Sequence, residues 1–156
     1  MDQAQQAVFK IEKLYVKDLS LEVPNAPAIY LDATTPEVNV DIATQAGIVG
    51  DGFYEVTLSV TVTAKIAEDE KVLFLVEVAQ SGVFQIRNVP QEELEPILLI
   101  GCANILFPYV REAVSDAVTR AGFQPVLLSP VNFEAMYEAR QQQLAAEQPK
   151  IEVPIQ

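Results

Sequence analysis

The strongest constraint on the fold is a strictly alternating stretch, residues 53–66. Its apolar positions are Tyr54, Val56, Leu58, Val60, Val62, Ala64 and Ile66, and between them stand Glu55, Thr57, Ser59, Thr61, Thr63 and Lys65. In an extended strand, successive side chains point to opposite faces, so this pattern predicts a strand with one buried and one polar face. Such a strand needs a sheet beside it and a second layer to cover its apolar face.

Three further segments have strand-like patterns: residues 8–21, 37–42 and 71–80. The first slips in its alternation near residues 12–13, as a bulged edge strand does. The second is followed by residues 47–52, which we predict to form a turn. In the last, Leu73 and Leu75 alternate with apolar neighbours, so its first half is apolar on both faces and something must cover the second face.

The pattern becomes helical after Gly82. Residues 90–95 supply a proline and acids suited to the start of a helix, and residues 97–103 are an apolar block. Residues 104–120 carry apolar side chains at helical spacing and end before Gly122, which predicts an amphipathic helix.

A last helix is predicted to open at Ser129 and Pro130, with the hydroxyl as its cap. Strands followed by helices are typical of an α+β fold, here a four-stranded antiparallel sheet with the C-terminal helices packed on it. We expect a single domain over residues 1–146 and a mobile C-terminal tail over residues 147–156.

Composition excludes much of enzyme chemistry. The chain has no His and one Cys, Cys102, so it lacks histidine acid–base catalysis, Ser–His and Cys–His pairs, and multi-Cys metal sites. No pair of carboxylates stands out, and no glycine-rich phosphate loop occurs. We therefore expect no enzyme, no cofactor and no metal.

Charge and hydropathy indicate the cellular compartment in which the chain functions. With 10 Lys and Arg against 22 Asp and Glu, the net charge is −12, which repels nucleic acid and anionic membranes. The N-terminus does not resemble a secretory signal, and the longest apolar run, residues 97–103, is far shorter than the roughly 20 residues of a membrane span. A lone Cys suits a reducing compartment, so we expect a cytoplasmic protein without membrane insertion.

Half of the residues are hydrophobic, more than one four-stranded sheet obviously hides. Three explanations are open: helices that cover the sheet, a homo-oligomer interface, or a groove that receives apolar segments of a partner. Two aromatic residues that we place in loops, Tyr30 and Phe107, favour the groove a little, although such residues often serve only local packing.

Three motifs carry a family resemblance: KDLSLEVPNAP at residues 17–27, NILFPYVRE at residues 104–112 and SPVNF at residues 129–133. With them, the chain closely resembles the bacterial SecB export chaperones from about residue 9 to residue 144. The resemblance implies a homotetramer, a dimer of dimers, that binds unfolded precursor proteins in hydrophobic grooves without ATP. It also implies delivery of these precursors to the SecA translocase ATPase. A SecB-like chaperone dedicated to one partner, such as an antitoxin, is the alternative.

The resemblance also implies site residues. The SecA-docking residues would be Asp18, Glu22, Leu75 and Glu77, and the client-binding groove would contain Val38, Val40, Ile42, Phe107, Tyr109, Met136 and Tyr137. Two features depart from the family. The loop before Pro36 has Thr34 where the family usually has Trp, so one groove pocket is expected to be shallower, and the tail lacks the strongly acidic end of many members.

Overall fold

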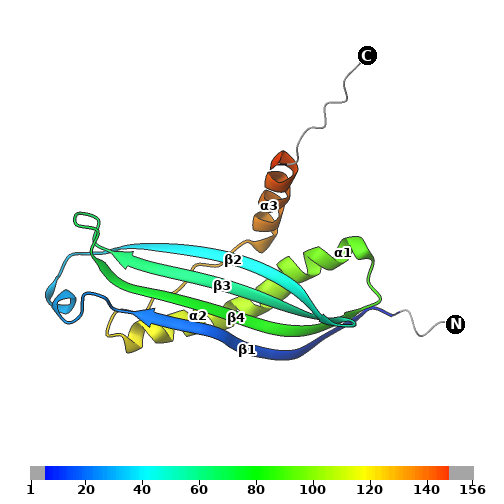
Figure 1. Ribbon diagram of the computed structural model, residues 1–156, viewed down its shortest axis with the longest axis horizontal. Helices are drawn as coiled ribbons and strands as arrows, with labels where there is room; N and C mark the ends of the chain where they lie inside the picture. The colour runs from blue at the N-terminus through cyan, green and yellow to red at the C-terminus, as the bar shows by residue number, and fades with distance from the viewer. Residues whose placement is uncertain (1–5, 148–156) are drawn as a thin grey trace, which may run out of the picture.

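The computed structural model describes residues 6–147. Its strands are β1 (Val8–Glu22), β2 (Glu37–Gly50), β3 (Phe53–Lys65) and β4 (Val72–Arg87), and its helical elements are η2 (Ala28–Leu31), α1 (Gln91–Pro96), η3 (Ile97–Cys102), α2 (Ala103–Arg120) and α3 (Phe133–Glu147). The strands form one antiparallel sheet in the order β1-β4-β3-β2, so β1 and β2 are its edges (Figure 1). The predicted α+β arrangement is confirmed.

Elements α1, η3 and α2 form one continuous helix, Gln91–Arg120, that lies across one face of the sheet (Figure 1). We call this side of the sheet the helix face and the other side the outer face. By length and composition this helix is long and apolar enough to cross a membrane. We did not predict this from the sequence, because its longest apolar run, residues 97–103, is short. Its buried residues pack on the sheet, as those of a core helix in a soluble protein do.

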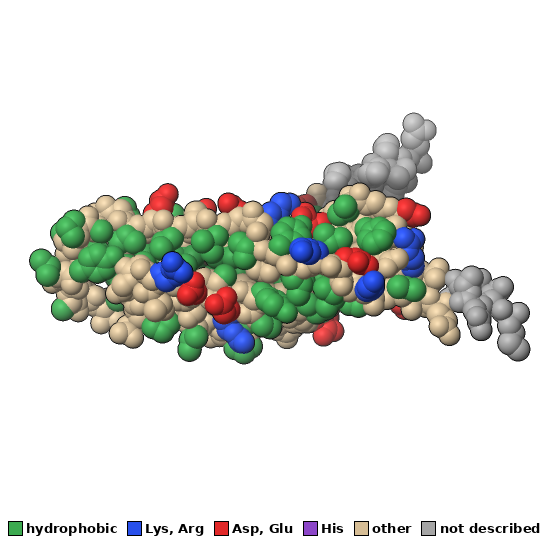
Figure 2. All heavy atoms as spheres, turned by 90° about the horizontal axis from the view of Figure 1, so that it is seen from below, with side chains coloured by type: hydrophobic (Ala, Val, Ile, Leu, Met, Phe, Trp, Pro, Cys, Tyr) green, Lys and Arg blue, Asp and Glu red, His purple; other side chains and the backbone are tan. Residues whose placement is uncertain are grey.

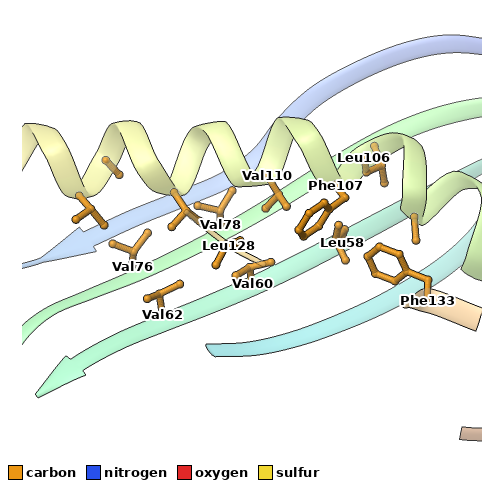
Figure 3. Packing of buried hydrophobic residues seen from close by; sticks show 14 of the residues in the cluster. Leu58, Val60, Val62, Val76, Val78, Leu106, Phe107, Val110, Leu128 and Phe133 are labelled. Carbon is orange, nitrogen blue, oxygen red and sulfur yellow. The ribbon is translucent and has the colours of Figure 1, made fainter. Parts of the chain in front are cut away.

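The core lies between the helix face and α2 (Figure 3). Alternate residues of the two central strands meet successive turns of the helix, and their side chains are almost fully removed from water. Figure 3 labels the contributors from these elements, Leu58, Val60 and Val62 of β3, Val76 and Val78 of β4, and Leu106, Phe107 and Val110 of α2, together with Leu128 and Phe133 from later in the chain. Burial of apolar surface on this scale is the main force that holds helix and sheet together.

Residues 121–132 lead from the end of α2 back to α3 without regular structure. Leu128 packs into the core, and the Phe133 ring meets Phe107 edge-on, with ring centroids 6.0 Å apart. The remainder of α3 stands beside the β2 edge, and Phe133 is its one fully buried residue (Figure 1). The helix is therefore anchored at its first residue.

The start of α3 differs from the prediction. The backbone N–H of Ala135 donates to Oδ1 of Asn132 at 3.0 Å, so Asn132 caps the helix, and not Ser129. An Asn side chain three residues before the donor satisfies one of the free N–H groups, whereas Ser129 and Pro130 belong to the extended connection. Of the predicted tail, Glu147 ends α3, and residues 148–156 lie outside the described residues.

Two strands are longer than predicted. The expected turn at residues 47–52 is strand up to Gly50, because Gly47 and Gly50 pair with Glu55 and Phe53 of β3. Only Gly52, with φ of 76°, adopts the left-handed backbone that a tight turn needs. The segment beyond Gly82 that we expected to be helical continues β4 to Arg87, held by ladders with both β1 and β3.

The two aromatic residues assigned to loops are both in helical elements. Phe107 lies in α2 and is buried against the sheet, so it is a core residue. Tyr30 lies in η2, where its ring stacks on Phe123 at 5.3 Å and its hydroxyl donates to the carbonyl oxygen of Ala121 at 2.6 Å. Tyr30 therefore joins η2 to the end of the long helix.

Candidate functional site

The four predicted docking residues share the outer face. In the antiparallel register, Glu22 lies opposite Leu75. Directly opposed residues of an antiparallel pair point to the same side. Ser20 likewise lies opposite Glu77, and Asp18 opposite Ala79. Because Val76 and Val78, the neighbours of Glu77, are buried under the long helix, Glu77 must point outward. We call Asp18, Glu22, Leu75 and Glu77 the acidic face.

Strand β3 supplies a polar floor beside these acids. Thr61 pairs with Glu77, and Ser59 pairs with Ala79, next to Asp18. Asp18, Glu77, Ser59 and Thr61 line one shallow hollow of about 230 Å³. On the far side of Thr61, β2 places Asp41 in the same row. Asp41 is exposed, and we did not single it out because its distance from Glu77 depends on the strand order.

A cation also lies on this face. Lys17 donates from Nζ to Oε1 of Glu55 at 2.8 Å, and the Tyr15 hydroxyl donates to Oε2 of the same carboxylate. The hydrogen bonds from Lys17 and then Tyr15 lower the pKa of Glu55. Burial and the adjacent Glu55 carboxylate raise the pKa of Tyr15. Glu55 is therefore ionised and Tyr15 protonated at neutral pH, which keeps all three groups paired.

An apolar groove runs between the β2 edge and α3. One hollow of about 310 Å³ is lined by Ile42, Ala43, Thr44, Leu99, Phe133, Met136, Tyr137 and Arg140. A second hollow of about 450 Å³ shares Leu99 and Arg140 with it and adds the apolar side chains of Ile48, Leu94, Leu98 and Leu144. We call the two hollows together the β2 groove. The predicted groove residues Ile42, Met136 and Tyr137 meet in it.

The other predicted groove residues lie elsewhere. Val38 and Val40 continue the row of Ile42 along β2, and they are 46% and 41% exposed. Phe107 lies in the core, where its edge-on contact with Phe133 supports the groove from below. Tyr109 is two residues further along α2, a turn of about 200°, and its side chain faces solvent, so the structure does not bring it into the groove.

Polar contacts hold α3 over the groove. The side-chain amide of Gln141 donates to Oε1 of Glu95 at 2.9 Å, and Nη1 of Arg140 reaches the carbonyl oxygen of Thr44 at 3.4 Å. Tyr137 lies near the same Glu95, and its pKa is raised by burial and by that carboxylate. These exposed contacts are individually weak, so α3 is attached much less firmly than α2.

Exposed hydrophobic side chains follow the β1 edge. Phe9, Ile11, Val16 and Leu19 are each between 42% and 50% exposed. Their partners on β4, Ile86, Phe84, Gln80 and Val78, alternate along the strand on the same side as the buried Val76, so all four are on the helix face. Figure 2, which looks at the molecule from the β1 side, shows hydrophobic side chains gathered along this edge. We call these four residues the β1 strip.

Comparison with known proteins identifies the family. A family model described as "Preprotein translocase subunit SecB" matches residues 2–144. This chain belongs to the SecB family. Protein-export protein SecB from Aromatoleum aromaticum is 66% identical over 139 residues, which cover 89% of this chain and 87% of that protein. Protein-export protein SecB from Dechloromonas aromatica is 61% identical over 156 residues, 100% of both chains.

A solved structure supports the SecB fold. The Mycobacterium tuberculosis SecB-like chaperone, in complex with a ChAD peptide from the HigA1 antitoxin, is 16% identical, with a TM-score of 0.66 over 79% of this chain and 90% of that chain. The family is one of protein-export chaperones and not of enzymes. Among residues 6–147, no group of three or more His, Cys, Asp and Glu side chains is arranged to hold a metal ion.

Proposed function

We propose that this SecB family member holds unfolded precursor proteins in the cytoplasm without ATP and delivers them to the SecA translocase ATPase. The observation that carries the proposal is that an acidic surface and an apolar groove lie on different sides of one sheet. The acidic face lies on the outer side, and the apolar β2 groove opens beside the helix side. A chaperone with this arrangement can hold an unfolded precursor, here called a client, in the groove while its outer face contacts the SecA ATPase.

The β2 groove suits segments that a folded protein would bury. Its lining combines Ile42, Leu99 and Phe133 with the flexible Met136, and these side chains accept many apolar shapes. Val38 and Val40 extend the apolar surface beyond the hollow. Binding of this kind is driven by removal of apolar area from water, so it needs neither a catalytic group nor nucleotide.

The acidic face suits a basic partner. Glu22 lies opposite Leu75, and Glu77 lies two residues further along β4, so a partner gains both charge attraction and an apolar contact in one place. The net charge of −12 attracts basic surfaces over longer distances as well. We assign this face to SecA, with Asp18, Glu22, Leu75 and Glu77 as its contact residues.

We also propose that the chain assembles as a tetramer, a dimer of dimers. The β1 strip supports this, because it is an exposed apolar row on an edge strand. The small residues Ala113 and Ala117 of α2 add no support, because Ala117 is buried against its own sheet. Static light scattering at micromolar concentration should give the tetramer mass, and a monodisperse monomer would contradict the proposal.

The main proposal is tested by adding the purified protein to several unrelated proteins during refolding from denaturant. We expect suppressed aggregation of all of them without nucleotide, and binding to SecA in calorimetry. Holding of one partner only, such as an antitoxin, would favour the dedicated chaperone. That alternative has weaker support, since the antitoxin-binding structure is 16% identical, against 61% and 66% for the export proteins.

A further inference from the structure

The second bulge of β1 brings a cation next to a docking acid. Val16 pairs with Gln80 and Asp18 with Ala79, so Lys17 is an additional residue with no partner in the ladder. In a regular strand, Lys17 and Asp18 would point to opposite faces. Here both line the same hollow on the outer face, together with Glu55 and Ser59. An ammonium group therefore shares a surface with the Asp18 carboxylate.

The cation is bound on its other side. Nζ of Lys17 lies 2.8 Å from Oε1 of Glu55 on β3, which is separated from β1 by β4 in the sheet. The second oxygen of Glu55 accepts a hydrogen bond from the Tyr15 hydroxyl, which fixes the orientation of the carboxylate. Tyr15 itself lies opposite Ser81, whose hydroxyl forms a buried hydrogen bond with Thr57 at 2.8 Å. The acceptor for Lys17 is thus held by packed neighbours.

Stability does not explain this arrangement. The Lys17 side chain is about half exposed, and ion pairs at such positions contribute little to folding. The consequence lies in charge placement. Asp18 follows Lys17 in the chain, and without Glu55 the remaining carboxylate that lines their shared hollow would be that of Asp18. Pairing there would neutralise a docking acid and occupy its oxygens.

We propose that Glu55, oriented by Tyr15, is a positioning residue that holds Lys17 away from Asp18 and so keeps the Asp18 carboxylate free for a basic partner. The proposal rests on SecA docking at the acidic face. It differs from direct contact, because Glu55 acts on the partner only through Lys17. Removal of the cation must therefore cancel the effect of losing Glu55.

The test is a set of charge variants in the tetrameric protein, titrated with SecA by calorimetry at low salt. Glu55→Gln should weaken binding about fivefold, because Lys17 turns to Asp18. Adding Lys17→Met to Glu55→Gln should restore the affinity. Glu12→Gln is the matched control: Glu12 also lies at a β1 bulge and pairs with a lysine, Lys10, at 3.7 Å, and its loss changes the net charge equally.

Four outcomes would overturn the proposal. Wild-type affinity in Glu55→Gln, with weakened binding in Asp18→Asn, would refute the positioning role and leave the docking face intact. Equal losses in Glu55→Gln and Glu12→Gln would show that only net charge matters. No rescue by Lys17→Met would show that Glu55 does not act through Lys17, because the double variant has the wild-type net charge. Unchanged affinity in Asp18→Asn would refute docking at this face and the positioning role with it. Client holding and tetramer mass are measured for each variant to identify any that misfold. If Glu55→Gln misfolds, Tyr15→Phe replaces it, because it removes the hydrogen bond that orients Glu55, and it should also weaken SecA binding.

Discussion

Glu22 of β1 lies directly opposite Leu75 of β4 on the outer face of the sheet. The pair places a carboxylate beside an exposed part of an apolar side chain, although the two residues are far apart in the sequence. Two residues along, Ser20 lies opposite Glu77. The antiparallel register of the edge strand thus builds one mixed acidic and apolar surface from two distant motifs.

The first prediction concerns the core. Leu106 is fully buried between α2 and the sheet, so Leu106→Ala should lower the free energy of unfolding by about 2–5 kcal/mol, from lost burial and a residual cavity. Leu127, which is 75% exposed, is the control, and Leu127→Ala should change stability by no more than about 0.5 kcal/mol. Urea unfolding at fixed protein concentration measures both. Equal effects would contradict the packing described for α2.

The second prediction concerns Cys102, whose thiol is fully buried. Desolvation raises its pKa from 9.0 to about 12, so the thiolate fraction at pH 8 should be about a thousandfold lower than for an ordinary thiol. A colourimetric thiol reagent should react very slowly with the native protein and rapidly in urea. Fast reaction without denaturant would show that the helix opens readily.

The same shift determines a pH effect on stability. In the unfolded chain the thiol loses its proton near pH 9.0, whereas in the folded protein it keeps the proton up to about 12. The unfolded state therefore binds fewer protons above pH 9, and the contribution of Cys102 to stability falls as the pH rises through this window. Cys102→Ala should remove that component of the pH dependence.

The third prediction concerns clients. Val40 is 41% exposed on the helix face, next to Ile42 of the groove, so Val40→Glu should fold normally. Each bound client segment would have to desolvate the new charge, which costs more than the ~1–3 kcal/mol of an uncharged polar group, so client affinity should fall about tenfold or more. Asn39→Glu on the opposite face is the control. Intact client binding with a broken tetramer would assign Val40 to a subunit interface instead.

Parts of the fold were predictable because a local period encodes them. The alternation in residues 53–66 predicted β3, and the slip near residues 12–13 predicted the first bulge of β1. The second half of β4 was missed, since Gly82 resembles a strand end when its ladder partners Leu14 and Val56 are unknown. Tertiary hydrogen bonding outweighs the weak local preference of glycine there.

The sites were predictable only in part. The resemblance supplied the acids of the docking face, and the register brings them to one side of the sheet. Lys17 and Glu55 were not singled out, because only the bulge in β1 and the strand order, which puts β3 one strand beyond β4, bring them together. On α2, the run Ile105–Leu106–Phe107 is apolar on every side, so the spacing did not distinguish buried Leu106 from exposed Tyr109.

The last prediction concerns the docking face itself. Asp18 and Glu77 line one hollow with Ser59 and Thr61. If both carboxylates face a basic surface of SecA, charge reversal converts attraction into repulsion, and salt should screen the interaction. Asp18→Lys or Glu77→Lys should therefore abolish most SecA binding in calorimetry at low salt, and the wild-type affinity should fall as salt is added.

Glu134→Lys provides the control for this experiment. Glu134 is an exposed acid in the first turn of α3, away from the outer face, and its reversal changes the net charge by the same amount. Client holding and tetramer mass should stay unchanged in all three variants, because both docking acids point away from the core and the groove. Unaltered SecA affinity in both docking variants would refute the face, since no direct contact could survive two such reversals. A uniform loss that includes Glu134→Lys would instead mean that SecA responds to the overall charge of the chaperone and not to the register that sets Asp18 beside Glu77.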